Sequence, residues 1–283
     1  MAKEVEREYP ENFDLVEYDE VDSTNDELRR ILEGHIYKGD VPMHTQVCPL
    51  IVLAQRQTKG RGRLGRRWES PPGGLYISLA LEVSDASERI ASLSLLVALA
   101  VRRELGELTR QASEQDSGDE SGQDILVKWP NDIVCSQGKL AGILIELVQL
   151  THKEGTSQQQ YALIGVGINI KRPKEEASER AAYLSDSCRT TPSIYQMAEI
   201  IITGILDYHA HWEAAGYDFA SLASEYNANH SLASEEVVVS NGEGEVLAKG
   251  SVQGVDDSGF LLLLDDKGNL AKIGTGEVSL GGI

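Results

Sequence analysis

The chain has 283 residues, of which 41% are hydrophobic and 25% charged, a composition typical of a globular domain rather than of a disordered or fibrous protein. Its 26 basic residues are outnumbered by 45 acidic ones, giving a net charge of −19, and this acidity argues against a general nucleic-acid binder. No apolar run approaches the roughly 20 residues of a membrane helix, and no secretory signal is visible. Cys48, Cys135 and Cys188 lack disulfide or metal-site spacing. We therefore expect a cytoplasmic protein that binds neither membranes nor nucleic acid.

The first strong signal along the chain is the start of a helix, after a short and weakly alternating strand. Thr24 and Glu27 have the spacing of a capping box, apolar residues then repeat at helical spacing, and Gly34 is expected to end the helix. The side chains of Ser23, Thr24 and Asn25 have two interpretations. They cap the helix, which the motif alone favours, or they hold a small ligand at its amino terminus.

A glycine- and arginine-rich loop follows an apolar strand at residues 50–54. From Lys59 to Arg67 the chain carries five positive charges, three glycines and no acid. The glycines match G-x-G-x-x-G, but Trp68, two prolines and a strand follow where a dinucleotide-binding fold requires a helix. Two interpretations remain. The loop either closes over a carboxylate and a phosphate, whose oxygens bind to N–H groups and guanidinium forks, or it is a mobile surface hairpin.

The middle of the chain predicts a long helix, an insertion and an interrupted strand. Apolar residues repeat at helical spacing over residues 85–108, whereas residues 111–124 contain five acids and no large apolar side chain, so we expect a flexible acidic insertion there. Residues 125–134 predict a strand broken by Pro-Asn-Asp. Lys128 ends the first half of this strand, where a buried lysine requires an anion, whereas an edge lysine extends its charge into solvent.

The remainder of the chain completes an α+β fold. Two further apolar segments are expected to be strands, and in the second of them Gly165 and Gly167 leave one face without side chains, which suggests close approach by a ligand or another backbone. Two helices follow. From residue 234, short strands separated by turn residues predict a small antiparallel barrel. The predicted domains are residues 1–233 and residues 234–283.

Taken together, these segments resemble the biotin–protein ligases, the enzymes that attach biotin to a lysine of carboxylase subunits. The resemblance rests on motifs that occur in the family order over nearly the whole chain: Val21-Asp22-Ser23-Thr24-Asn25, Gly60-Arg61-Gly62-Arg63-x-Gly65-Arg66-x-Trp68-x-Ser70-Pro71, Lys128-Trp129-Pro130-Asn131-Asp132, Lys139-Leu140-Ala141-Gly142-Ile143-Leu144-Ile145-Glu146, Gly165-Val166-Gly167-Ile168-Asn169 and, more weakly, Gly276-Glu277-Val278-Ser279-Leu280. The glycine loop is specific in combination with K-W-P-N-D, and each alone is only suggestive.

The resemblance implies a catalytic domain with a mixed sheet flanked by helices, followed by an SH3-like barrel. It also implies a reaction in two steps that requires Mg²⁺. The biotin carboxylate attacks the α-phosphate of ATP, which yields biotinyl-5′-AMP and pyrophosphate. A lysine of a biotin carboxyl carrier domain then attacks the mixed anhydride and displaces AMP.

The site residues are carried over from the matching motifs. Lys128, Arg61 and Arg63 would bring two mutually repelling anions together and stabilise the charge of the transition state. The resemblance implies contacts to biotin from Ser23, Thr24, Asn25, Gln57, Arg61, Gly62, Arg63 and Lys128, and contacts to ATP or adenylate from Gly60, Arg61, Arg63, Trp68, Asn131 and Asn169. Trp68 could equally pack the hairpin, and Asp132, as well as Asn131, could hold the metal or merely turn the chain.

Two rival functions remain at this level. A lipoate–protein ligase shares the catalytic scaffold but usually shows an R-R-x-S-G-G-G-type loop, which this sequence lacks. A non-catalytic biotin or nucleotide sensor would not need the three cations. Only about a dozen residues precede the first expected strand, so no amino-terminal DNA-binding domain is expected. Neither the identity of the acceptor protein nor the pairing of two chains into a homodimer follows from the sequence.

Overall fold

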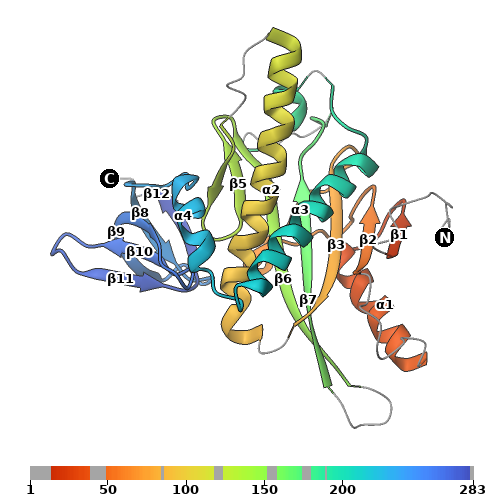
Figure 1. Cartoon of the computed structure of the whole chain (residues 1–283), viewed down its shortest axis with the longest axis horizontal. Helices are drawn as coiled ribbons and strands as arrows, with labels where there is room; N and C mark the ends of the chain where they lie inside the picture. Colours follow the sequence, from red (N-terminus) through yellow and green to blue (C-terminus); the bar gives the residue numbers. More distant parts are fainter. Residues whose placement is uncertain are drawn as a thin grey trace. The chain divides into compact units, whose positions relative to one another are not determined.

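The computed structural model describes residues 14–38, 49–83, 86–117, 124–151, 158–173, 180–188 and 190–280 (Figure 1). The chain divides into two compact units, and each is described by itself. The first comprises Met1–Glu88, Ala141–Ser178 and Pro192–Ala198, and the second comprises Arg89–Leu140, Glu179–Thr191 and Glu199–Ile283. The helices and strands mix in both units, which confirms the predicted α+β class. None of the helices in the described part is both long and apolar enough to cross a membrane.

The first unit is built on a mixed sheet. Its strands are β1 (Asp14–Tyr18), β2 (Leu50–Ala54), β3 (Leu75–Glu82), β7 (Gln158–Ile168) and β6 (Gly138–Thr151). β1 pairs with β2 in parallel, and the other neighbours are antiparallel. Within this unit the strand order is β1-β2-β3-β7-β6. β2 is buried along its whole length, as its uninterrupted apolar sequence predicts.

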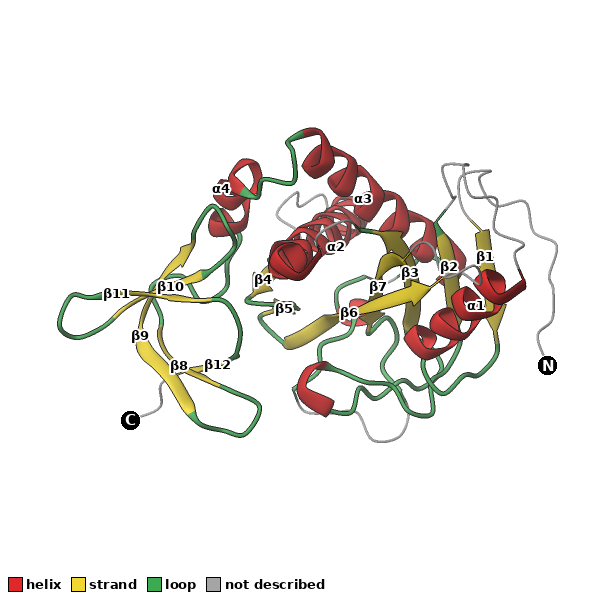
Figure 2. Ribbon diagram, turned by 90° about the horizontal axis from the view of Figure 1, so that it is seen from below, coloured by secondary structure: helices red, strands yellow, loops and turns green. Residues whose placement is uncertain are grey.

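Helix α1 (Thr24–Lys38) packs against β2, β3 and β7 (Figures 1 and 2). Leu28 and Leu32, on successive turns, face a cluster of buried side chains from the strands. The predicted end of this helix at Gly34 is wrong, because the helix runs on to Lys38. Gly34 does not adopt the left-handed conformation by which glycine usually ends a helix.

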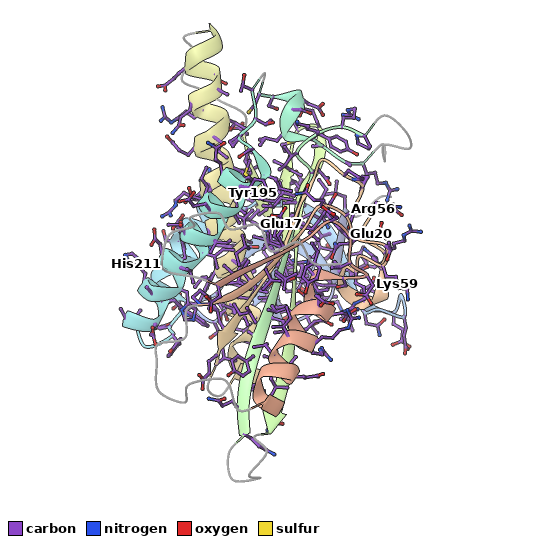
Figure 3. All side chains as sticks on the ribbon, turned by 90° about the vertical axis from the view of Figure 1, so that its right-hand side faces the viewer. Glu17, Glu20, Arg56, Lys59, Tyr195 and His211 are labelled. Carbon is purple, nitrogen blue, oxygen red and sulfur yellow. The ribbon has the colours of Figure 1, made fainter. Side chains whose placement is uncertain are left out.

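The edge of the first unit is held by polar contacts around β1. The Tyr195 hydroxyl donates to Glu17 Oε1 at 2.5 Å, and the Gln55 amide donates to the same oxygen at 3.2 Å (Figure 3). Arg56 pairs with Glu20 at 3.1 Å between two exposed side chains, and such exposed pairs contribute little to stability.

The described residues of the second unit include a hairpin, the helix α4 and most of the helices α2 and α3. The helices are α2 (Ala86–Ser117), α3 (Ile194–Ala214) and α4 (Ala220–Ala228), and the hairpin consists of β4 (Leu126–Lys128) and β5 (Asp132–Cys135). Gly204 allows the close approach of α3 to α2, since a Cβ there would lie 2.8 Å from Glu104 Cγ. The guanidinium of Arg103 also lies 4.7 Å from the centre of the Tyr208 ring.

The predicted end of the second helix near residue 108 is wrong, because α2 continues to Ser117. Arg110 pairs with Glu107 at 2.7 Å and with Glu114 at 2.8 Å, and pairs at this spacing stabilise a helix without burying apolar surface. The polar composition that suggested an insertion thus describes a solvated end of the helix. Residues 118–123 lie outside the described residues, so the predicted flexibility of the insertion stays a prediction.

The carboxyl-terminal strands form an antiparallel sheet in the order β11-β10-β9-β8-β12. Their bounds are Leu270–Ile273, Leu261–Leu264, Val246–Val255, Glu236–Ser240 and Glu277–Leu280. The predicted turns are confirmed. Asp256, for example, accepts the backbone N–H groups of Ser258 and Phe260 at 3.0 Å, with Gly259 at φ 80°. The antiparallel sheet is therefore established in the described residues.

Candidate functional site

The parallel pairing of β1 and β2 brings Gln57 to the amino terminus of α1. Beyond the two strands the pairing continues as a bridge between Val21 and Gln57, and the Thr58 N–H donates to the Val21 carbonyl at 2.9 Å. Gln57 Oε1 consequently accepts the backbone N–H of Thr24 at 2.8 Å and the Thr24 hydroxyl at 3.2 Å. Thr24 and Gln57, 33 positions apart in the sequence, are therefore joined by two hydrogen bonds.

The predicted capping box is wrong. The Thr24 side chain bonds to Gln57 rather than to the backbone of α1, and the Glu27 N–H donates to the Ser23 carbonyl at 3.0 Å. The Glu27 carboxylate instead accepts the Tyr18 hydroxyl at 3.0 Å and pairs with Arg30. The side chains of Thr24 and Glu27 thus each bond to a residue outside the helix, and not to one another's backbone as in a capping box.

Asn25 links the helix to two strands. Its side chain is only 3% exposed, its Oδ1 accepts the Ser78 hydroxyl at 2.6 Å, and its Nδ2 donates to Glu146 at 2.8 Å. The Ser78 hydroxyl also lies 2.7 Å from Thr24 Oγ1. Because buried polar groups are costly unless they are paired, this network holds the segment 23–25 in one arrangement.

The glycine loop forms a tight hairpin. The Gly62 N–H donates to the Arg66 carbonyl at 2.7 Å, and the Trp68 N–H donates to the Gly60 carbonyl at 2.9 Å. Between them, Leu64 (φ 55°) and Gly65 (φ 73°) have left-handed backbone conformations. Arg63, at the start of this turn, is partly buried. The loop therefore presents its basic side chains from a hydrogen-bonded backbone.

Gly60 is required by close packing. A Cβ at this position would collide with the Trp68 carbonyl oxygen and lie 2.6 Å from Ser70 Oγ and 3.1 Å from Gln57 Nε2. Ser70 Oγ accepts from Gln57 Nε2 at 2.9 Å and donates to the Trp68 carbonyl at 3.1 Å. The loop thus begins against a chain of hydrogen bonds that runs from Thr24 through Gln57 to Ser70.

The predicted close approach at Gly165 and Gly167 is confirmed, and the approaching groups are side chains of the same unit. A Cβ on Gly165 would lie 2.6 Å from Asn25 Oδ1, and one on Gly167 would lie 2.5 Å from Trp68 Nε1. Trp68 is partly buried against β7, and Asn169 follows the end of this strand and is also partly buried. The bare face of β7 is therefore covered by Asn25 of the segment 23–25 and by Trp68 of the glycine loop.

Arg61 is surrounded by acids that the sequence interpretation had not assigned. Its Nη1 and Nη2 donate to both carboxylate oxygens of Asp26, the latter contact at 2.9 Å, and Nη2 also donates to Glu146 at 3.0 and 3.2 Å. The hydrogen bond to Asp26 raises the pKa of the guanidinium, against partial burial that lowers it, and the charge of Glu146 raises it further. In this structure these donors of Arg61 are therefore bonded to protein carboxylates.

The second unit carries the K-W-P-N-D segment as a hairpin with a cis bond between Trp129 and Pro130. Lys128 is partly buried at the end of β4 and lies opposite Asp132 in the strand register. Asp132 pairs with Lys139 Nζ at 2.6 Å, and Asn131 is partly buried in the turn. No group of three His, Cys, Asp or Glu residues in the described ranges is arranged to hold a metal ion.

Residues 229–231 support this hairpin from the side. Val127 exchanges backbone hydrogen bonds with Asn229 and Ser231 at 2.9 and 2.8 Å. The Trp129 N–H donates to His230 Nε2, and its indole N–H donates to the Gly259 carbonyl, each at 3.4 Å. Burial lowers the pKa of His230 from 6.5 to about 4, so its imidazole is neutral near pH 7. The strand β4, which carries Lys128, is thus hydrogen-bonded on one side to β5 and on the other to residues 229–231.

The first unit brings together nine of the predicted site residues. Four further residues, to which the sequence interpretation assigned no role, bond to them. The nine are Ser23, Thr24, Asn25, Gln57, Gly60, Arg61, Gly62, Arg63 and Trp68, and the four are Asp26, Ser70, Ser78 and Glu146. Glu146 closes one of the matched motifs and Ser70 lies in another, and membership of a motif was the signal for both residues. Ser78 interrupts an apolar strand, which marks a buried hydroxyl that needs a partner.

Comparison with known proteins identifies the family of this chain. The model of the biotin/lipoate A/B protein ligase family matches residues 19–169, and that of the biotin protein ligase C-terminal domain matches residues 235–281. The chain therefore belongs to the biotin/lipoate A/B protein ligase family, and the resemblance to biotin–protein ligases is confirmed.

Three relatives illustrate the similarity. A biotin–[acetyl-CoA-carboxylase] ligase of Paracoccus denitrificans is 31% identical over 82% of this chain and 90% of its own length. A protein of the same name from Mycobacterium tuberculosis is 29% identical over 81% of this chain and 78% of its own. The structure of the Aquifex aeolicus biotin protein ligase in complex with biotin and ATP superposes with a TM-score of 0.70 at 25% identity, covering 95% of this chain and 98% of that one.

Proposed function

We propose that this protein is an ATP-dependent biotin–protein ligase, which forms biotinyl-5′-AMP and transfers the biotin to a lysine of a biotin carboxyl carrier domain. The observation that carries the proposal is the buried network of neutral polar groups from Thr24, Asn25, Gln57 and Ser78 beside the glycine loop. Biotin and ATP are the ligands of a relative that aligns with 95% of this chain, and this supports the two substrates.

The chemistry of the network favours biotin over lipoate. The ureido ring of biotin is uncharged and carries two N–H donors and one carbonyl acceptor, which amide and hydroxyl side chains can satisfy. The dithiolane ring of lipoate has none of these groups and can form no such hydrogen bonds with the network, so we expect lipoate to bind more weakly than biotin. Ser23, Thr24, Asn25 and Gln57, together with Gly62 of the loop, are therefore the proposed biotin contacts.

The proposed reaction joins two anions, so it needs fixed positive charge. Arg63 in the glycine loop and Lys128 on β4 are assigned to the carboxylate and phosphate oxygens from their match to the family motifs. Charge that develops on the phosphorus centre would be stabilised by about 3 kcal/mol from one well-aimed donor. Gly60, Trp68, Asn131 and Asn169 are proposed to contact the nucleotide. Attack by the acceptor lysine then breaks the anhydride and releases AMP.

Among the residues that the structure describes, no group of His, Cys, Asp or Glu side chains forms a metal site. The Asp132 carboxylate is paired with Lys139, so we do not assign it as a Mg²⁺ ligand. Mg²⁺ is commonly held by phosphate oxygens, with one or two carboxylates and several waters. When bound with ATP, it would neutralise charge on the leaving pyrophosphate.

The proposed domain boundary is residue 234, with an SH3-like barrel beyond it. The family model that covers residues 235–281 supports this boundary, and the antiparallel sheet with three tight turns supports the barrel. A cytoplasmic location, where ATP and carboxylases are present, belongs to the same proposal. Pairing of two chains is left to a measurement of mass in solution.

Release of pyrophosphate from ATP tests the function directly. The protein is incubated with ATP and Mg²⁺ and with biotin, lipoate or neither. We expect pyrophosphate release in the incubation with biotin, and none with lipoate or without either acid. Equal or faster release with lipoate would instead identify a lipoate–protein ligase. Binding of biotin without release of pyrophosphate or labelling of a carrier domain would identify a sensor.

A further inference from the structure

The donors of Arg61 are directed at protein carboxylates. A guanidinium has five N–H groups in a fixed plane, and two of its edges can bind a carboxylate or phosphate in a bidentate manner. The edge formed by Nη1 and Nη2 is taken by Asp26, and the second N–H of Nη2 is taken by Glu146. The other donors, on Nε and Nη1, lie on different edges. In this arrangement Arg61 has no complete edge for a substrate anion.

The charges of the cluster support the same conclusion. Two carboxylates, Asp26 and Glu146, lie against one guanidinium, so the group as a whole is negative. A carboxylate or phosphate brought to Arg61 would have to displace one of these acids, and the displaced acid would lose its charged partner. Arg61 is 34% exposed and each acid 27% exposed, so water screens part of this cost.

The cluster joins three elements of the first unit. Asp26 lies in the first turn of α1, Glu146 lies on β6, and Arg61 lies in the glycine loop. Glu146 Oε2 also accepts the Asn25 amide at 2.8 Å, so one carboxylate oxygen bonds both to the glycine loop and to the segment 23–25. The orientation of Asn25 therefore depends on the same acid as the position of the loop.

We propose, on the basis of the proposed function, that Arg61 is a positioning residue rather than an anion-binding one. Its guanidinium fastens the glycine loop to α1 and β6 through Asp26 and Glu146, and thereby sets the backbone of Gly60 and Gly62 beside the biotin ring. Glu146 is the second positioning residue, because it fixes Arg61 and Asn25 together. The binding of the substrate carboxylate and phosphate falls to other cations.

A neutral analogue of biotin separates the two roles. Biotinol has the same rings but an alcohol in place of the carboxylate. If Arg61 positions the loop, Arg61→Met should weaken binding of biotin and of biotinol by the same factor, about tenfold for a partly exposed charged contact. If Arg61 binds the carboxylate, only biotin should lose affinity. Isothermal titration calorimetry with the full chain measures both.

Glu146→Gln and Asp26→Asn are independent variants, for which a positioning role and an anion-binding role of Arg61 predict opposite changes in biotin affinity. Removing a competing carboxylate would strengthen or preserve biotin binding if Arg61 bound the anion, whereas we expect weaker binding of both ligands. Hydrogen exchange at the amides of Gly62 and Trp68 should become faster in these variants, since their hydrogen bonds close the hairpin. A structural defect elsewhere would not alter these amides selectively.

Arg110→Met is the matched control, because Arg110 also lies between two carboxylates, on α2 and outside the named site. We expect wild-type affinities for both ligands. If Arg61→Met does not fold, the milder Asp26→Asn carries the comparison. A selective loss of biotin affinity, or wild-type affinities in every variant, would overturn the proposal. Failure of the wild-type protein to bind either ligand would instead refute the proposed function.

Discussion

The bare face of β7 gives the sharpest test of the site, through Gly165→Ala. The added Cβ would lie 2.6 Å from Asn25 Oδ1 and 3.2 Å from its Cγ, well inside van der Waals contact. Asn25 is 3% exposed and cannot move outward without breaking its contacts to Ser78 and Glu146. We therefore expect the amide to be displaced from its present position.

The expected cost follows from these contacts. Overpacking by one methyl group costs about 1–3 kcal/mol, and each hydrogen bond lost costs about 1 kcal/mol. If about 2 kcal/mol of this appears in ligand binding, the affinity for biotin should fall by roughly 30-fold. Titration calorimetry measures this value, and thermal unfolding reports the part of the cost that appears as lost stability.

Gly34→Ala and Gly106→Ala are the controls, because a Cβ at either position meets nothing within 4 Å. Both glycines lie inside helices, where alanine is favoured by about 0.5–1 kcal/mol, so these variants should be slightly more stable and should bind biotin normally. A folded Gly165→Ala variant with wild-type affinity for biotin would show that the position of Asn25 does not matter.

Two further predictions concern the second unit. Lys128→Ala should lower the rate of pyrophosphate release by about 100-fold, the equivalent of about 3 kcal/mol, with little change in biotin affinity. The control Lys272→Ala, at an exposed lysine, should alter neither quantity. An equal loss of affinity and rate in Lys128→Ala would assign Lys128 to ground-state binding. Because burial lowers the pKa of His230 from 6.5 to about 4, the unfolded state takes up the proton first as the pH falls. The stability that the neutral imidazole confers is therefore complete above about pH 6.5 and is lost towards pH 4. The free energy of unfolding should fall over this range by up to ~3 kcal/mol more than that of His230→Gln. If urea unfolding gave the same pH dependence for both proteins, the histidine would not be buried in this way.

Local sequence patterns predicted most of the elements. The short antiparallel strands predicted from residue 234 are present, among them Glu236–Ser240 and Val246–Val255, because alternating side chains and turn residues are local signals. The ends of α1 and α2 were predicted wrongly. Gly34 is compatible with a helix interior, and charged pairs such as Arg110 with Glu114 sustain a helix that lacks an apolar face. Helix ends depend on such competing contacts and not on composition alone.

Motifs likewise identified the residues of the site more readily than their partners. Ser23, Thr24, Asn25 and the glycine loop could be named because each lies in a short, specific pattern. That Gln57 would bond to Thr24 followed only from the parallel pairing of β1 and β2, which no local signal specifies.

The sequence by itself determined the family, the order of the strands and helices along the chain, and the positive glycine loop in an acidic protein, because these depend on residue types at short spacing. Tertiary structure alone decided what Arg61 binds. Its partners Asp26 and Glu146 lie 35 and 85 residues away, on a helix and a strand that meet only in the folded unit. The charge of a side chain is a property of the residue, whereas the neutralisation of that charge depends on which residues folding brings within hydrogen-bonding distance.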